Sequence, residues 1–266
     1  MNTKRNAMTP MKSKTKRQTV AGRPSRKRKK NTARETTEAV LIALLAAMLL
    51  RAFVVQAFRI PTGSMKDTLL VGDFLLVNKF VYGVRTPDRI PLIDAEIPFF
   101  RLPSFKQPKN GDVVVFKYPK EPKLDYIKRC IATPGQTLEI RNGEVFIDGQ
   151  PEGKRFDLGK RFDPEDGRYF RYTRMTTPYG KTYTTRHYVE DFKRNDNYGP
   201  TVVPDGHYFM MGDNRDNSSD SRVWGFVPAD NIVGEALIIY FSWSKSGTFA
   251  HFFDSIRWSR IANLIN

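Results

Sequence analysis

Cysteine and histidine are scarce in this sequence of 266 residues, which has one cysteine and three histidines. Cys130 has no second cysteine with which to form an internal disulfide, and a cysteine-rich zinc site is excluded for the same reason. His187, His207 and His251 show none of the spacings that are usual among metal ligands. We therefore expect no bound metal and no cofactor.

Acidic residues are also few, and their shortage is greatest at the N-terminus. The chain has 28 Asp and Glu residues against 44 Lys and Arg, a formal charge of +16. Residues 1–38 hold 13 of the basic residues and two acids, whereas the remaining 228 residues hold 31 basic and 26 acidic groups. A basic segment without apolar periodicity buries too little surface to fold. We predict a disordered head over 1–38, suited to anionic lipid or to nucleic acid.

One long apolar run follows the basic head. Residues 39–50 contain no polar side chain, and the run resumes after Arg51 as far as Phe58. About 20 apolar residues are what a helix needs to cross a bilayer, and Arg51 can extend its charge toward an interface. The sequence therefore predicts one transmembrane helix over 39–58. The basic head before it predicts a cytoplasmic N-terminus, with the rest of the chain outside the cytoplasm.

The same run also suits the apolar part of a cleaved secretory signal, or a buried core helix. A leader of 38 residues before the run exceeds a typical signal peptide, and the run is apolar on every side rather than on one face. The membrane anchor is the better interpretation. It favours anionic lipid as the partner of the head, and no nucleic acid is expected.

Beyond residue 58 the sequence alternates between strand-like segments and turns. Six segments are rich in β-branched and aromatic residues and are bounded by Gly, Pro, Asn or Asp: 74–80, 112–118, 124–132, 137–149, 207–213 and 232–243. The pair Asn142-Gly143 is a strong hairpin signal. We predict an all-β, mostly antiparallel domain. Residues 151–203, charged and aromatic with many Gly and Pro, are interpreted as an insertion between core segments 59–150 and 204–266, and His187 within it as incidental.

A serine and a lysine are the candidates for catalysis. The sequence Pro-Thr-Gly-Ser at 61–64 suits a tight turn that presents Ser64. A serine nucleophile needs a base, and the histidines in a predicted strand and in the C-terminal tail are poorly placed. Lysine accepts a proton when burial lowers its pKa. Lys128, in a strand-like segment, is the candidate, although either motif alone is more often an ordinary turn or a solvated lysine.

A polar loop over 211–222 is the third notable segment. Its density of Asp, Asn and Ser predicts a tight loop whose side chains bond its own backbone. An acidic calcium-binding loop is the alternative, but Arg215 and Arg222 offset the acids. We predict Asp–Arg pairing within the loop.

Three sequence motifs match those of a known family: PTGSM (61–65), YIKRCIATPGQ (126–136) and MGDNRDNSSDSRVWGFVP (211–228). In this order after an apolar run, they resemble the type I signal peptidase family of bacteria, which cleaves leader sequences from exported proteins. The third motif is long and very specific. The resemblance covers about residues 55–135 and 204–235. It implies a membrane-bound serine endopeptidase with an all-β catalytic unit of coiled antiparallel sheets.

The resemblance also implies residue roles. Ser64 matches the nucleophile and Lys128 the general base, while Thr62 matches a hydroxyl, usually from Ser, that joins the Ser64 backbone N–H in an oxyanion hole. Ser218 matches the serine that orients the lysine. The remaining matched positions are the supporting ion pair, Asp220 with Arg222, and the start of the third motif, Gly212 and Asp213. Three positions depart from the family pattern, Asp67 where Pro is usual, Ala132 where Gly is usual and Gln136 where Asp is usual.

Preproteins with Ala-x-Ala cleavage sites are the substrates that the resemblance implies. Two small alternate side chains need shallow apolar pockets along an extended strand, and the candidate lining residues are Phe58, Ile60, Val114 and Ile127. The implied location is the bacterial cytoplasmic membrane, with a single span and an extracytoplasmic catalytic domain. Two rivals remain open: a self-cleaving transcriptional repressor of the Ser-Lys class, and a catalytically inactive, membrane-tethered binding module.

Overall fold

The computed structural model describes residues 32–86, 100–189, 197–244 and 252–266. Most of the basic head and His251 lie outside these residues. The chain divides into two compact units, Met1–Ala43 and Leu44–Asn266. Helix α1 (Thr32–Phe53) begins in the first unit and ends in the second.

Helix α1 differs from the predicted transmembrane span at both ends. It begins at Thr32, so residues 32–38 of the head are helical where disorder was expected, and it ends at Phe53. Strand β1 (Val55–Arg59) follows and pairs with β2 (Asp73–Asn78). No helix within the described ranges has the length and apolar character that a membrane crossing requires. Residues 55–58 of the predicted span belong to β1 instead, where their side chains suit a sheet and their backbone pairs with β2.

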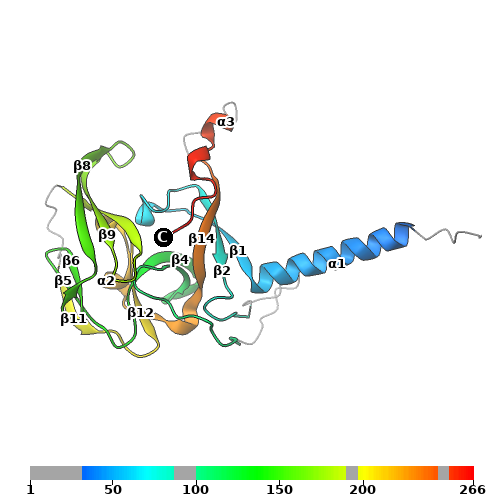
Figure 1. The fold of residues 1–266 in the computed structure, drawn as a ribbon, viewed down its shortest axis with the longest axis horizontal. Helices are drawn as coiled ribbons and strands as arrows, with labels where there is room; N and C mark the ends of the chain where they lie inside the picture. The colour runs from blue at the N-terminus through cyan, green and yellow to red at the C-terminus, as the bar shows by residue number, and fades with distance from the viewer. Residues whose placement is uncertain (1–31, 87–99, 190–196, 245–251) are drawn as a thin grey trace, which may run out of the picture. The chain divides into compact units, whose positions relative to one another are not determined.

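A seven-stranded antiparallel sheet forms the centre of the second unit, with strand order β1-β2-β14-β3-β4-β12-β13. The long strand β14 lies between β2 and β3, which come from the first half of the chain (Figure 1). The prediction of a mostly antiparallel β domain is confirmed. The remaining strands of this sheet are β3 (Val113–Tyr118), β4 (Glu121–Ala132), β12 (His207–Met211), β13 (Val227–Pro228) and β14 (Ile232–Ser242).

A four-stranded sheet contains the predicted hairpin. Its order is β11-β5-β6-β7, with β5 (Thr137–Arg141), β6 (Glu144–Ile147), β7 (Gln150–Pro151) and β11 (Tyr198–Val202). Asn142 and Gly143, between β5 and β6, have φ of 51° and 78°. Positive φ at both positions is what a two-residue type I′ turn requires, which confirms the hairpin signal.

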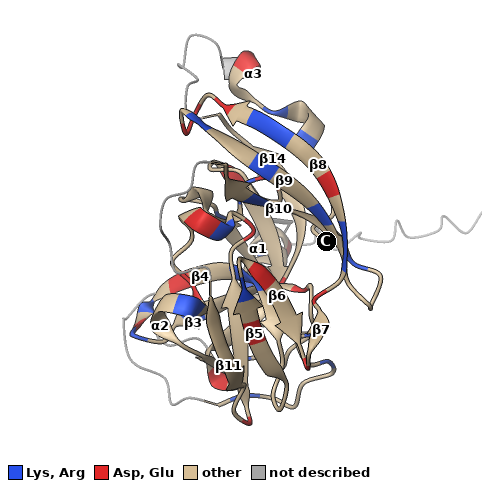
Figure 2. Ribbon diagram, turned by 90° about the vertical axis from the view of Figure 1, so that its left-hand side faces the viewer, with Lys and Arg blue, Asp and Glu red and all other residues tan. Residues whose placement is uncertain are grey.

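A three-stranded sheet lies within the residues interpreted as an insertion. Its order is β10-β9-β8, formed by β8 (Lys154–Asp163), β9 (Arg168–Thr176) and β10 (Thr182–Tyr188). Basic and acidic residues are interspersed along these strands (Figure 2). Since β11 pairs with β5, residues 151–203 contribute to two of the three sheets.

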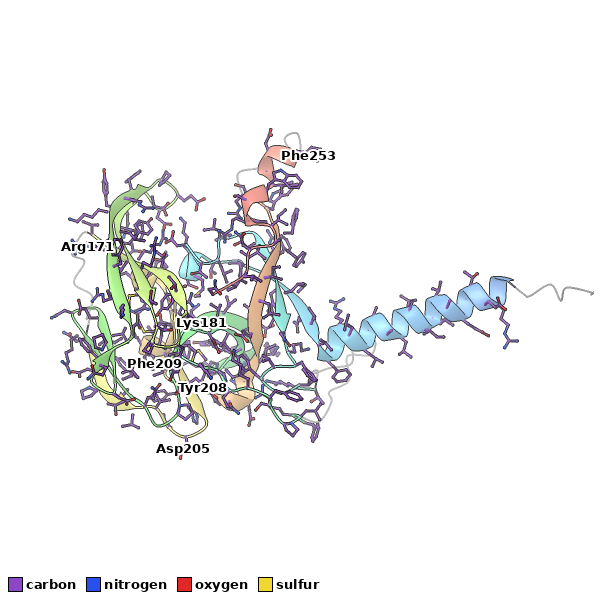
Figure 3. All side chains as sticks on the ribbon, viewed as in Figure 1. Arg171, Lys181, Asp205, Tyr208, Phe209 and Phe253 are labelled. Atoms are coloured by element: carbon purple, nitrogen blue, oxygen red, sulfur yellow. The ribbon has the colours of Figure 1, made fainter. Side chains whose placement is uncertain are left out.

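Three apolar clusters contain residues of the seven-stranded and four-stranded sheets, and neighbouring residues of one strand belong to different clusters. Tyr208 and Phe209 on β12, labelled in Figure 3, belong to the second and third clusters respectively, as strand alternation requires. The first cluster contains Met65, which directly follows Ser64, and Leu69 a few residues later. The short helices are η1 (Gly63–Met65), η2 (Arg215–Asn217), α2 (Ser221–Trp224), η3 (Ala229–Asn231), α3 (Phe252–Ser255) and η5 (Trp258–Arg260).

Candidate active site

Ser64 lies in η1, between two residues that are anchored in the first apolar cluster. Ile60 before it and Met65 after it are both buried there. The backbone carbonyl of Ser64 accepts the N–H of Asn214 at 3.0 Å, and the carbonyl of Gly63 accepts Asn214 Nδ2 at 3.0 Å. The turn that presents the serine is thus held by apolar anchors at its ends and by the polar loop across it.

Lys128 on β4 lies against Ser64. Its side-chain Nζ donates a hydrogen bond to Ser64 Oγ at 2.7 Å and another to the backbone carbonyl of Ile127 at 3.0 Å. Lys128 is only 4% exposed. Burial lowers its pKa to about 8, against the opposing effect of the Asp220 and Asp213 carboxylates. The predicted pair of residues is therefore brought together, with an amine that loses its proton near pH 8 rather than near pH 10.5.

The polar loop contains one of the expected Asp–Arg pairs. Arg222 contacts both oxygens of Asp220, with Nε–Oδ1 and Nη2–Oδ2 distances of 2.8 Å. Burial would raise the pKa of Asp220, but the Arg222 guanidinium outweighs it and lowers that pKa below its usual value. Arg215 pairs outside the loop, with Glu152 at 2.9 Å, because β7 brings that carboxylate beside it. Pairing within the loop is thus confirmed for Arg222 and wrong for Arg215.

Ser218 is close to the site but does not bond to the lysine as predicted. Its buried hydroxyl makes no hydrogen bond to Lys128, and it lies close enough to the Asp220 carboxylate to help lower the pKa of that group. The second bond of Lys128 goes instead to the carbonyl of Ile127, which precedes it on the same strand. Gly212 explains how closely these segments approach, since a Cβ there would lie 2.4 Å from Ser218 Oγ and 2.5 Å from the Ser64 carbonyl oxygen.

The remaining predicted residues are only partly gathered at the site. Thr62 is exposed and directly precedes η1, where its side chain makes no capping hydrogen bond. Phe58 and Ile127 are half-buried and pack on the first apolar cluster, to which the buried Ile60 belongs. Val114 is fully buried in the second cluster, apart from the first cluster on which Phe58 and Ile127 pack. Strand alternation on β3 turns Val114 toward the second cluster.

Sequence reasoning missed a buried ion pair at Arg129. Its guanidinium contacts both oxygens of Asp213, at 2.8 and 2.7 Å, and donates to the Gly111 carbonyl at 2.6 Å. Asp213, predicted only as the start of a motif, thereby links β4 to the polar loop. An arginine within the apolar half of a strand was the available signal, because a buried guanidinium requires a partner. In the described ranges no group of three or more His, Cys, Asp or Glu side chains is arranged to hold a metal.

Known proteins resemble this chain over most of its length. Residues 33–243 match the family described as signal peptidase, peptidase S26. A signal peptidase I from Pseudomonas aeruginosa is 39% identical over 214 residues, 75% of this chain and 69% of the relative. One from Aquifex aeolicus is 37% identical over 232 residues, 76% of this chain and 82% of the relative. A crystal structure of a signal peptidase I from Enterococcus faecalis matches 49% of this chain and 97% of its own, with 26% identity and a TM-score of 0.29.

Proposed function

The chain belongs to the S26 signal peptidase family, and we propose that it is a serine endopeptidase that removes signal peptides from exported preproteins, with Ser64 as nucleophile and Lys128 as general base. The contact of 2.7 Å between Lys128 Nζ and Ser64 Oγ carries this proposal. It satisfies the geometric requirement that a base lie within hydrogen-bond distance of the proton that it removes.

Lys128 acts in its neutral form. With a pKa of about 8, roughly a tenth of the molecules hold a neutral amine at pH 7. As Ser64 Oγ attacks the carbonyl carbon of the scissile peptide bond, its proton passes to Lys128 Nζ and then to the leaving amine. The resulting acyl-enzyme is hydrolysed by a water that the same amine deprotonates.

The negative charge on the attacked carbonyl oxygen needs donors. We assign this role to the backbone N–H of Ser64 and the hydroxyl of Thr62. The exposed Thr62 side chain precedes the η1 turn, and Ser64 lies within that turn. Both donors therefore come from one short segment, whose backbone is held by Asn214.

Small residues before the cleaved bond are the expected specificity, of the Ala-x-Ala type. The candidate pocket lining is reduced to Phe58 and Ile127, half-buried residues on β1 and β4 that pack on the same cluster. Ile60, 2% exposed, belongs to the cluster against which they pack. An extended substrate strand lying along these residues would present alternate side chains to them.

We place this activity at the extracytoplasmic face of the bacterial cytoplasmic membrane, where exported preproteins emerge. Helix α1 exposes apolar side chains such as Leu41 and Leu45, each 60% exposed, which suit a lipid surface. The basic residues before it would add attraction to anionic lipid. Fractionation of cells that produce the full chain should recover it with the membranes, and recovery in the soluble fraction would contradict this location.

Cleavage of a precursor tests the proposed function. Wild type, Ser64→Ala and Lys128→Ala are incubated in detergent with a precursor that has alanines before its cleavage site, and each variant is checked by thermal melting. A matched precursor with a large residue at the position before the cut is the control. We expect cleavage of the first precursor only, and a loss of at least about a thousandfold in both variants. A folded wild type that cuts nothing would instead support the inactive binding module.

A further inference from the structure

The segment that directly follows Ser64 is held by the turn between β8 and β9. Lys66 Nζ lies 2.8 Å from Asp163 Oδ2, 2.8 Å from Glu165 Oε2 and 3.3 Å from Asp166 Oδ2. Lys66 is 9% exposed and Asp163 is 8% exposed. Removing one partner of such a buried pair costs more than removing one partner of a surface pair, because it leaves a buried charge without its counter-charge. Figure 1 shows the β8–β9 hairpin to which this acidic turn belongs.

Arg186 on β10 completes the cluster from the other side. Its Nη1 contacts Asp163 Oδ2 at 2.6 Å and its Nη2 contacts Asp166 Oδ2 at 2.5 Å. The guanidinium is fully buried and lies over the ring of Phe170, 4.0 Å from the ring centroid. Lys66 and Arg186 thus share two carboxylates, and the catalytic segment is joined to two strands of the inserted sheet.

Strand β10 also forms backbone contacts with the polar loop over 211–222. The N–H of Arg186 donates to the carbonyl of Asp213 at 3.0 Å, and residues 186 and 214 form an isolated parallel bridge. The N–H of Asn214 in turn donates to the carbonyl of Ser64. Arg186 therefore reaches Ser64 by two routes, through the acidic turn and Lys66, and through the backbone of residues 213 and 214.

Asp67 shows why this segment needs external support. Its φ is 82°, in the left-handed region, which a proline cannot adopt because its ring fixes φ near −65°. Asp is among the few residues that tolerate this region. Its carboxylate Oδ2 lies 3.8 Å from Arg186 Nε. The rigid turn that a proline would supply after Ser64-Met-Lys is absent at this position, and charged groups of the insertion contact the segment instead.

We propose that the Asp163–Asp166 turn and Arg186 are positioning residues for Ser64, which act through Lys66 and Asp67 to hold the serine hydroxyl against Lys128. This inference rests on the proposed function. It gives the β8–β9 turn and β10 a role in the reaction, although they contribute neither the nucleophile nor the base. Misplacing a reacting group by about 1 Å costs roughly a hundredfold in rate, so a clamp at this point has a measurable effect on turnover.

A double-mutant cycle on the full chain tests the clamp. The variants are Lys66→Met, which keeps the aliphatic stem, Asp163→Asn, which keeps the shape, and both together. Glu144→Gln is the matched control, since it removes an exposed ion pair with Arg155 of β8 that lies outside the cluster. For each protein, kcat and KM for precursor cleavage are measured, and kcat is expressed per folded molecule from the thermal melt.

The expected result separates positioning from stability. Lys66→Met and Asp163→Asn should each lower kcat per folded molecule by about 10- to 100-fold, with KM changed less than about threefold. The double variant should be no worse than the poorer single one, because both changes break the same link. Lys66→Arg should restore most of the turnover, and Glu144→Gln should match wild type.

Two other outcomes overturn the proposal. If the variants only melt at lower temperature, with unchanged kcat per folded molecule, the cluster serves stability alone. If the two losses multiply in the double variant, Asp163 does not act through Lys66. In either case an active wild type leaves the peptidase function intact. An inactive, folded wild type would remove the proposed function and this inference together.

Discussion

Arg129 and Asp213 form an ion pair in which two guanidinium nitrogens each contact a different carboxylate oxygen, at 2.8 and 2.7 Å, with both side chains fully buried. The pair joins β4, one residue beyond Lys128, to the loop that holds Ser64. Its guanidinium also lies over the ring of Tyr183, 3.8 Å from the centroid. The strand of the candidate base and the support of the candidate nucleophile are thus fixed to each other.

Removing one partner of this pair should destabilise the protein strongly. We expect Asp213→Ala to lower the free energy of unfolding by about 3 to 5 kcal/mol, because it leaves a buried guanidinium without its counter-charge. Asp125→Ala is the control, since Asp125 pairs with the partly exposed Lys117 at 3.1 Å, and it should cost less than about 1 kcal/mol. Urea titrations of both variants measure the difference. If both variants lost the same free energy of unfolding, the buried pair would be no more important for stability than the partly exposed one.

The pH dependence of cleavage should follow the proton on Lys128. Burial lowers its pKa from an ordinary value of 10.5 to about 8. The neutral amine is the active form, so kcat/KM should rise with pH and level off above about 8. Initial rates between pH 6 and 10, at substrate concentrations below KM, measure this profile. A plateau already reached at pH 6, in a protein that stays folded throughout, would rule out Lys128 as the titrating base.

The lowered pKa of Lys128 also predicts that this residue reduces the free energy of unfolding. Because the pKa of Lys128 is lower in the folded protein, folding disfavours its protonated form by about 3 kcal/mol at pH 7. That cost fades as pH rises from about 8 to the unfolded value near 10.5. Lys128→Met should therefore raise the melting temperature at pH 7 and show a smaller gain at pH 10. A Lys128→Met protein that melts below wild type at pH 7 would show that the charge is stabilised.

A side chain larger than hydrogen at position 212 should impair both folding and activity. A Cβ at this position would meet Ser218 Oγ and the Ser64 carbonyl oxygen well inside contact distance. We expect Gly212→Ala to lower the melting temperature and to reduce cleavage per folded molecule, because the Ser64 backbone must shift. At Gly63 an added Cβ would meet nothing closer than Lys66 Cδ at 3.9 Å, so Gly63→Ala should melt close to wild type. Similar melting of the two variants would contradict this packing argument.

The core strands could be predicted because their signals are local. Alternating apolar residues bounded by turn residues identify segments such as 113–118 and 137–147, and Asn142-Gly143 fixes a hairpin. The end of the apolar run at 54–58 could not be predicted in this way, since the same residues suit a helix and an edge strand. Its pairing with residues 74–78 decides the outcome.

The residues of the candidate site also fall into two groups, those that the sequence predicts and those that only the structure reveals. Ser64 and Lys128 were identified from motifs, and the structure places them in contact. Lys66 and Arg186 carry no signal in the sequence, because a charged residue in a polar stretch usually faces solvent. Their burial depends on carboxylates about 100 and 20 residues away. Only the tertiary structure brings these charges together.

The residues that hold the loop after Ser64 come from late in the chain. Asp73 accepts a hydrogen bond from Ser242, 169 residues later, and pairs with Arg260, 187 residues later. Contacts between such distant residues form slowly, since long loops must close first. Asp73 at the start of β2 is therefore held by side chains of β14 and η5, which are made long after Ser64. If the proposed activity is correct, we expect a chain that lacks the β14 and η5 partners of Asp73 to cleave poorly.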